Sequence, residues 1–157
     1  KAKYFLPSVD EWYKAAYYDP NAGVYYDYPT GSDSVPDGID FAGDTTFDAV
    51  FRDGGSNTQP NDITDVGVLS PYGTAGQGGN VFEWEETDLD LVNDASSSAR
   101  GIRGGSWGVE AFNLLSSVRR DINPRFVGGF RVASIPEPNT ILMGVLATGG
   151  LLVRTRR

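Results

Sequence analysis

The side chains with the clearest chemical potential in this chain are carboxylates. Residues 22–79 are rich in Gly, Asp, Asn, Pro and Thr, and their aspartates that could bind a metal are Asp33, Asp37, Asp40, Asp44, Asp48, Asp53, Asp62 and Asp65. Carboxylate oxygens are the ligands that calcium prefers, and a long irregular stretch in a compact domain often needs an ion or a ligand to organise it. Their spacing differs from that of an EF-hand loop. The alternative is that they are solvated turn residues that cap their own backbone.

Two glutamates could take part in acid–base chemistry. Glu83 lies between Phe82 and Trp84, and Glu110 precedes Phe112 by two residues. Aromatic surroundings raise the pKa of a carboxyl by desolvation, which is how such a group becomes a general acid. The sequence alone does not bring these two glutamates into one cleft.

The composition removes most other catalytic chemistry. The chain has 157 residues, with no cysteine and no histidine. It therefore has no disulfide, no thiolate metal site, no cysteine nucleophile and no histidine base. Of its 13 basic residues three lie at positions 154–157, so residues 1–138 carry 10 basic and 21 acidic side chains, a net charge of −11. Such a surface repels phosphate backbones, and we expect no nucleic-acid partner.

A few regular elements are expected to position these residues. Ser8 and Glu11 have the spacing of a capping box, which predicts that a helix begins there. Val9, Trp12, Tyr13 and Ala16 fall on one face of that helix, and Asp19-Pro20 should end it. We expect the residues of this face to pack in the core.

Three short segments have the pattern of strands. Residues 80–84 alternate bulky and polar side chains, and residues 100–107 should form a strand that ends at a glycine pair. Residues 130–133 are expected to form a core strand that closes the domain. Residues 76–79 are glycine-rich, but no Lys-Ser/Thr pair and no long helix follow, so tight turns are expected rather than a phosphate site.

The last residues have a different design. The prolines of Pro136-Glu137-Pro138 interrupt regular structure, residues 139–153 carry no charge, and Arg154, Arg156 and Arg157 end the sequence. Fifteen residues are fewer than the roughly 20 of a lasting transmembrane helix, so a buried core element is an alternative. Arginines resist translocation, and this order would keep them cytoplasmic while the preceding domain faces outward.

This tail resembles the PEP-CTERM sorting signal of Gram-negative bacteria, which exosortase processes. The resemblance divides the chain into a domain, residues 1–134, and a tail, residues 135–157, with a hydrophobic helix at 139–153. It implies an exported protein that is anchored in the inner membrane by the tail before processing, and is then placed at the cell surface or outside the cell. Because the first residue is Lys1 rather than Met, the chain is expected to be a fragment or a processed product, and the sequence leaves open what precedes it.

Four motifs make the domain similar to the formylglycine-generating enzyme family, also called the sulfatase-modifying factor family. In order, they are residues 6–12 (LPSVDEW), 79–84 (GNVFEW), 103–107 (RGGSW) and 129–133 (GFRVA). Together they span residues 1 to about 134, which corresponds to the C-terminal half of such a domain. The resemblance implies an α+β architecture, namely a variant C-type-lectin-like fold with little regular structure.

The resemblance also implies what this chain lacks. Oxidases of the family bind copper through a cysteine pair and convert a sulfatase cysteine to formylglycine, and those positions fall at Val109 and near Leu114. Neither side chain binds copper, so we expect no copper. Sulfoxide-synthase relatives use iron held by histidines, which this chain does not have. We therefore expect no catalytic residues of the family type.

Other family positions can be carried over. Ser106, Trp107, Phe82 and Val109 would lie in the family cleft, although the first three could equally be packing residues. A calcium site is implied at Glu83, with backbone oxygens near Gly79 and Val81; it would be weaker here because Gly76 replaces a ligand. A second calcium site would lie between Asp48 and Asp62. Arg119, Arg120 and Arg131 are expected to be ion-paired structural residues rather than ligands for an anionic partner.

Three functions remain open. The first is an exported, non-catalytic domain that binds a protein or glycan, or serves in the envelope or matrix, after sorting by an exosortase-type system. The second is a formylglycine-generating or related oxidoreductase with altered chemistry, using carboxylates such as Glu83 or Glu110. The third is a ligand-binding protein diversified by a retroelement, with variation within residues 107–126, although this stretch lacks a dense Asn-rich run.

Overall fold

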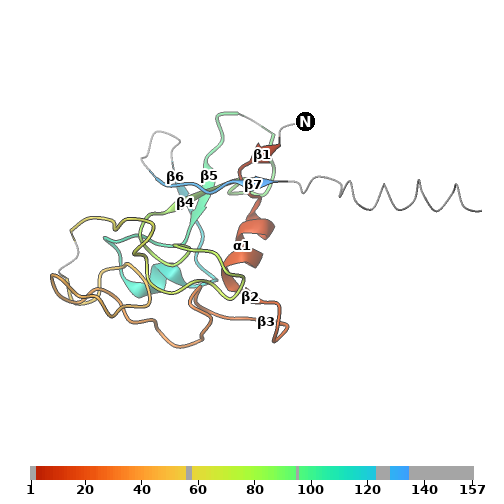
Figure 1. Ribbon diagram of the computed structural model, residues 1–157. Coiled ribbons are helices and arrows are strands. Elements are labelled where there is room, and N and C mark those ends of the chain that lie inside the picture. Colours follow the sequence, from red (N-terminus) through yellow and green to blue (C-terminus); the bar gives the residue numbers. More distant parts are fainter. Residues whose placement is uncertain (1–2, 56–57, 95, 123–127, 135–157) are drawn as a thin grey trace, which may run out of the picture.

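The architecture is a small α+β fold in which turns and irregular segments predominate (Figure 1). The computed structural model describes residues 3–55, 58–94, 96–122 and 128–134. Its elements are β1 (Tyr4–Phe5), α1 (Val9–Tyr17), β2 (Tyr18–Asp19), β3 (Val24–Tyr25), β4 (Glu83–Asp88), β5 (Arg100–Arg103), the 3-10 helix η1 (Ala111–Leu114), β6 (Arg120–Ile122) and β7 (Ala133–Ser134). The sequence prediction of an α+β domain with little regular structure is confirmed.

Helix α1 forms as its sequence predicts. The Glu11 backbone N–H donates to Ser8 Oγ, and the Ser8 backbone N–H donates to Glu11 Oε2 at 2.8 Å, which completes a capping box. Trp12 and Ala16 are fully buried, together with Tyr17. The amphipathic face therefore forms a core cluster, and the helix ends before Asp19 as expected.

The central sheet has the order β4-β5-β6, with both pairs antiparallel. Strand β5 ends at Arg103 because Gly104 and Gly105 follow with φ of 89° and 75°, a region that favours glycine. The strand predicted at residues 80–84 is displaced, since β4 begins only at Glu83. Asn80 has φ of 61°, and this left-handed residue makes a turn where a strand was expected.

Strand β7 corrects the prediction of a core strand at residues 130–133. It contains only Ala133 and Ser134, which pair antiparallel with Phe5 and Tyr4 of β1. Phe130 is 67% exposed and Val132 is 60% exposed. The apolar residues of this segment therefore lie at the surface of the described structure rather than in the core.

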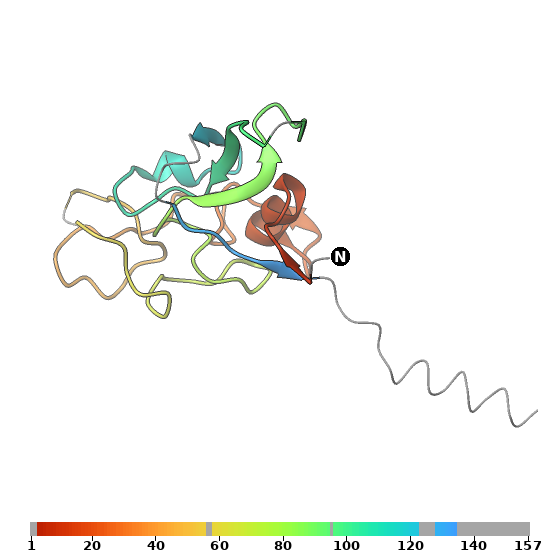
Figure 2. The same ribbon diagram turned by 90° about the horizontal axis from the view of Figure 1, so that it is seen from above.

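Residues 22–79 are mostly irregular, as predicted, but they supply much of the core. Two clusters anchor them: Tyr28, Ala49, Phe51 and Leu114 form one, and Ile39, Val50 and Val66 form the other. Gly79 allows a tight crossing, because a Cβ there would lie 2.1 Å from the Val50 carbonyl oxygen. Figures 1 and 2 place most of residues 37–66, drawn orange to yellow, at the opposite end of the body from β1 and β7.

The predicted sorting tail lies outside the described residues. This applies to the hydrophobic segment 139–153 and to the signal residues Pro136, Glu137, Pro138, Arg154, Arg156 and Arg157. Among the helices that the structure describes, none has the length and apolar character needed to cross a membrane.

Candidate functional site

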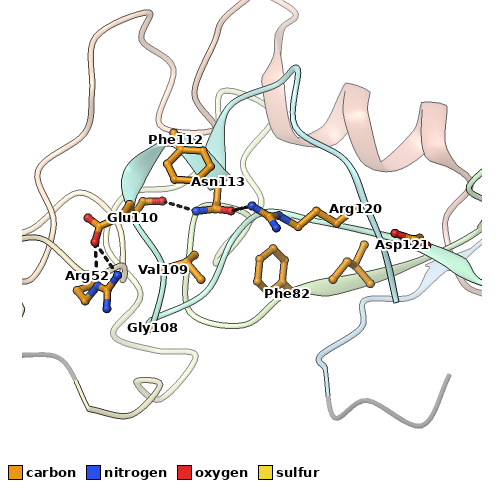
Figure 3. Close-up of a pocket in the computed structure, with 10 residues that line it drawn as sticks. Arg52, Phe82, Gly108, Val109, Glu110, Phe112, Asn113, Arg120 and Asp121 are labelled. Atoms are coloured by element: carbon orange, nitrogen blue, oxygen red, sulfur yellow. Dashed lines mark hydrogen bonds and ion pairs between the residues drawn. The ribbon is translucent and has the colours of Figure 1, made fainter. Parts of the chain in front are cut away.

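A surface pocket of about 410 Å³ lies between β6, the segment that follows β5, and the loop that carries Arg52 (Figure 3). Its walls combine charged, amide and aromatic side chains from distant parts of the sequence. The lining residues are Arg52, Phe82, Ile102, Gly108, Val109, Glu110, Phe112, Asn113, Arg120 and Asp121. A volume of this size suits a small molecule or a single residue of a larger ligand.

One wall is an ion pair that the backbone sets in place. The Arg52 backbone N–H donates to the Val109 carbonyl at 3.0 Å, which brings the loop against the segment after β5. Arg52 Nη2 and Nε then lie 2.7 and 2.9 Å from Glu110 Oε1. The two side chains are 48% and 54% exposed, so both can also reach a ligand in the pocket.

A buried amide connects this wall to Arg120. Asn113 is 3% exposed, and its Nδ2 donates to the Glu110 carbonyl at 3.0 Å. Its Oδ1 accepts a hydrogen bond of 2.6 Å from Arg120 Nη2. Figure 3 shows this connection running from Glu110 through Asn113 to Arg120. The amide therefore fixes the Arg120 side chain at the pocket.

Apolar side chains complete the pocket. Ile102 is almost fully buried, Phe82 and Val109 are half-buried, and Phe112 is 53% exposed. The site can therefore bind an apolar or ring portion of a ligand against the phenylalanines, and polar groups against the arginines and carboxylates.

The structure brings together two of the four predicted cleft residues. Phe82 and Val109 line the pocket. Trp107 packs instead against the core cluster of Ile39, Val50 and Val66, while the Ser106 carbonyl accepts a hydrogen bond from the Val109 N–H in a turn. Leu114 is fully buried in the core.

Most of the pocket was not predicted from the sequence. Arg52 and Glu110 are separated by 58 positions, and a backbone hydrogen bond from Arg52 to Val109 brings their two irregular segments together. Phe112 and Asn113 lie in a 3-10 helix too short to leave a periodic pattern. The one signal in the sequence was an aromatic residue followed by an amide, Phe112-Asn113.

Glu83 is buried beside α1 and away from the pocket wall, with 6% of its surface exposed. Its Oε2 accepts hydrogen bonds from Trp12 Nε1 at 2.7 Å and from Arg131 Nε at 2.5 Å, and its Oε1 accepts one from Arg131 Nη2 at 2.6 Å. Both oxygens are engaged, so a calcium ion at Glu83, Gly79 and Val81 would require Arg131 to move. Calcium at this position stays a prediction.

A second buried carboxylate, Glu85, binds two arginines. It is fully buried, with Arg103 Nε 2.8 Å from Oε1 and Arg119 Nε 2.6 Å from Oε2. Gly101 of β5 makes room for this network, because a Cβ there would lie 2.4 Å from atoms of Arg119 and Glu85. Ion pairing is thus confirmed for Arg119 and Arg131, whereas Arg120 binds the Asn113 amide at the pocket.

The aspartates of the long loops have turn roles in several places. Asp44 and Asp62 accept hydrogen bonds from the backbone N–H and hydroxyl of Thr46 and Thr64, and these bonds lower the pKa of each carboxyl. Desolvation, and then the neighbouring carboxylates of Asp44, Asp48, Asp40 and Asp53, raise the pKa of Asp37. In the described part of the chain, no group of three or more Asp or Glu side chains is arranged to hold a metal ion.

Solved structures share this fold. The chain is similar to the protein in the crystal structure of CarF, with a TM-score of 0.59 and 20% identity over 85% of this chain and 48% of that one. It is also similar to Treponema denticola variable protein 1, with a TM-score of 0.58 and 23% identity over 85% of this chain and 48% of that one. The chain thus spans about half the length of these structures. No curated protein matches it.

The sequence itself matches a known family over nearly all of the folded part. Residues 1–135 match the family described as the Sulfatase-modifying factor enzyme 1-like domain. The four motifs of that resemblance occupy defined places in the fold: the start of α1, the entry to β4, the end of β5 and the segment before β7. The chain belongs to the Sulfatase-modifying factor enzyme 1-like domain family.

Proposed function

We propose that this chain is a non-catalytic ligand-binding domain that works outside the cytoplasm. The observation that carries the proposal is the make-up of the pocket. Val109 stands in it where the family resemblance places a copper-binding cysteine, and the whole chain has no cysteine or histidine. What remains is a recognition surface of two phenylalanines, two arginines and two carboxylates, which suits a ligand with both ring and polar groups.

Binding tests the proposal directly. Purified chain is titrated with a panel of oligosaccharides and short peptides, and any ligand found is retested with Phe112→Ala and Arg52→Ala. We expect both variants to weaken binding at least tenfold, because Phe112 is 53% exposed in the pocket and Arg52 is 48% exposed. Tyr72→Ala, which removes another exposed aromatic residue away from the pocket, is the matched control. A ligand insensitive to both pocket variants would contradict this site.

An oxidoreductase of the family type is the main competing function. It would require the copper-binding thiols or iron-binding imidazoles of the family, which this chain lacks because it has no cysteine or histidine, or carboxylate chemistry at Glu110. The assay is oxygen consumption with a sulfatase-derived cysteine peptide and copper. Consumption that depends on the peptide, and that is lost in Glu110→Gln, would replace the binding proposal.

A variable ligand-binding protein is a second candidate. Most pocket residues fall within 107–126, the stretch where diversification is expected, and Treponema denticola variable protein 1 has a similar fold. A reverse-transcriptase gene and a near-repeat of this coding stretch beside the gene would support diversification. Their absence from a complete genome would count against it.

Export and sorting rest on the tail. The order of Pro136-Glu137-Pro138, an uncharged segment and terminal arginines supports handling by an exosortase-type system. The protein would be held in the inner membrane by the tail, and then released to the surface or beyond. In a host with exosortase the chain should lose its tail, and in an exosortase deletion strain it should stay membrane-bound at full mass. The same mass in both strains would refute the sorting proposal.

Calcium at Glu83 is a further proposal with its own measurement. If calcium displaces Arg131 and is bound by Glu83 with backbone oxygens near Gly79 and Val81, saturating calcium should raise Tm relative to a chelator. The control is Glu83→Gln, in which the calcium-dependent shift should disappear. An unchanged Tm in the unaltered chain would leave Glu83 as the partner of Arg131 and Trp12 alone.

A further inference from the structure

Tyrosines gather where α1 ends and the β2–β3 hairpin begins. Of the eight tyrosines in the sequence, six lie between positions 13 and 28, and four of these six form an array of ring contacts that Trp12 joins at its buried end. Figure 1 places the hairpin at the opposite end of α1 from β1. The distances between ring centroids are 6.0 Å for Trp12–Tyr17, 4.9 Å for Tyr13–Tyr17, 5.5 Å for Tyr13–Tyr25 and 4.9 Å for Tyr18–Tyr25.

Tyr18 and Tyr25 are the outermost pair of this array. They lie directly opposite each other in the antiparallel β2–β3 register, and side chains at such positions share one face of the two strands. Their ring planes are tilted by 45°. Tyr25 is 51% exposed and Tyr18 is half-buried, so small reagents in the solvent can reach both phenols.

The inner rings of the array are held toward the interior. Tyr17 is fully buried, and its hydroxyl donates to a backbone carbonyl at 3.0 Å. Tyr13 is half-buried, and the guanidinium of the buried Arg103 lies 5.3 Å from the centroid of its ring. The two phenols that are both close together and open to solvent are therefore those of Tyr18 and Tyr25.

The hairpin that carries this pair is weakly held by its own backbone. β2 and β3 form a ladder of two residue pairs, and the turn residues 20–23 are all exposed. A two-stranded ladder of this length is marginal in water, and exposed loop tips are preferred sites of proteolysis. Small secreted domains commonly use disulfides to hold such elements, but this chain has no cysteine. A bond between two tyrosine rings is a covalent cross-link that this chain can form.

We propose that Tyr18 and Tyr25 are a modification site, at which a haem peroxidase and hydrogen peroxide join the two rings into an intramolecular dityrosine. Each phenol loses one electron and one proton, which gives two neutral phenoxyl radicals. The radicals couple through a bond between their ortho carbons, and the hydrogen on each of these carbons moves to the oxygen of its own ring and restores the phenol. The two electrons and two protons reduce one hydrogen peroxide to two waters. This cross-link does not depend on the ligand pocket, so its failure would leave the binding proposal intact.

Mass spectrometry tests the proposal on the 157-residue chain treated with a haem peroxidase and an equimolar amount of hydrogen peroxide. We expect a monomer that has lost two hydrogen atoms and that shows dityrosine fluorescence. Cleavage on the N-terminal side of aspartates should release residues 10–18 and 19–26 as one cross-linked product instead of two peptides. Tyr18→Phe and Tyr25→Phe keep the rings but remove the phenol, and each should abolish this product. Tyr72→Phe, at a 48% exposed tyrosine outside the array, is the matched control and should leave it unchanged.

Stability and the native protein give the second measurement. The cross-linked chain should have a Tm roughly 5 °C above that of the untreated chain, because a bond that closes a short loop removes conformations from the unfolded chain. A thiol reductant should not reverse the gain, since the bond joins two carbons. Protein isolated from its native source should carry the same bond. A cross-link between Tyr13 and Tyr25 instead, a covalent dimer as the main product, or native protein that has not lost the two hydrogens would each refute the proposal.

Discussion

Glu85 and Glu110 are both paired with arginines, yet they lie in opposite surroundings. Glu85 is fully buried between Arg103 and Arg119, whereas Glu110 is 54% exposed beside Arg52. Burial removes the hydration of a charge, so each buried charged side chain is stabilised only by its partners. The side chains of an exposed pair can instead leave each other and bind water or a ligand. The same residue types thus hold the sheet together in one place and offer a binding surface in the other.

The difference follows from the neighbouring backbone. Glu85 lies in the middle of β4 and faces β5, where Gly101 leaves space for the Arg119 guanidinium. Arg119 also donates to the carbonyls of Thr87, Asp88 and Leu89, so its position is fixed by four acceptors. Arg52 and Glu110 lie on irregular segments joined by one backbone hydrogen bond.

The strongest test of this comparison is Glu85→Gln. The substitution keeps the shape but leaves the buried Arg103 and Arg119 without a negative partner, and we expect a loss of about 3–5 kcal/mol in the free energy of unfolding. Chemical denaturation measures it. Glu86→Gln, one position along on the exposed side of the same strand, should change the stability by less than about 0.5 kcal/mol. Similar effects of the two variants would contradict a structural role for the buried network.

Trp12→Phe tests the other buried carboxylate. The indole donates to Glu83 Oε2 at 2.7 Å, and loss of a hydrogen bond to a charged group should cost about 2 kcal/mol. Tyr17→Phe is the comparator, because its hydroxyl donates to the neutral Leu114 carbonyl at 3.0 Å. Burial raises the pKa of that hydroxyl, which keeps it protonated. We expect about 1 kcal/mol for Tyr17→Phe; the reverse order would show that the charge on Glu83 adds nothing.

The buried side of this comparison was partly predictable from sequence. The Ser8–Glu11 capping box and the apolar spacing of α1 are local signals, and both are found in the structure. The glycine pair that ends β5 is local as well. The pairing of Glu85 with two arginines is not local, because Arg103 and Arg119 lie 18 and 34 positions further along the chain, and nothing in the local pattern specifies how these segments meet.

The exposed side was mostly not predictable. The family resemblance predicted Phe82 and Val109 in the cleft, and both line the pocket. Trp107 is half-buried and packs against the cluster of Ile39, Val50 and Val66 instead. The strand expected at residues 80–84 failed because the Asn80 amide bonds the backbone of Asn61 and holds a left-handed turn. Such contacts between loops are tertiary, so a single sequence does not contain a periodic signal for them.

Arg52→Ala measures how much the exposed Arg52–Glu110 ion pair contributes to stability. Because both side chains are about half exposed, the pair should contribute under about 1 kcal/mol to the free energy of unfolding. A double-mutant cycle with Glu110→Ala, measured by chemical denaturation at low and high salt, isolates the coupling free energy between the two side chains. The coupling should be small and should shrink further as salt screens it. A coupling as large as the Glu85→Gln effect would erase the distinction between the two regions.

The smallest expected effects lie in the pH response of exposed aspartates. Hydrogen bonds from Thr64, first from its N–H and then from its hydroxyl, hold the pKa of Asp62 below its ordinary value of 3.8. Any stability that the Asp62 carboxylate adds is therefore present above pH 3.8 and is lost as the pH falls through the lowered pKa. Desolvation, followed by repulsion from nearby carboxylates, raises the pKa of Asp37, so its unfavourable contribution to stability is relieved as the pH falls through the raised pKa.

Carboxyl NMR titration should show Asp37 protonating first as acid is added. Thr64→Ala should raise the pKa of Asp62 and leave Asp37 unchanged, whereas added salt should lower only the pKa of Asp37, by weakening its repulsive part. If Asp62 protonated before Asp37, the turn hydrogen bonds would not govern the protonation of these aspartates.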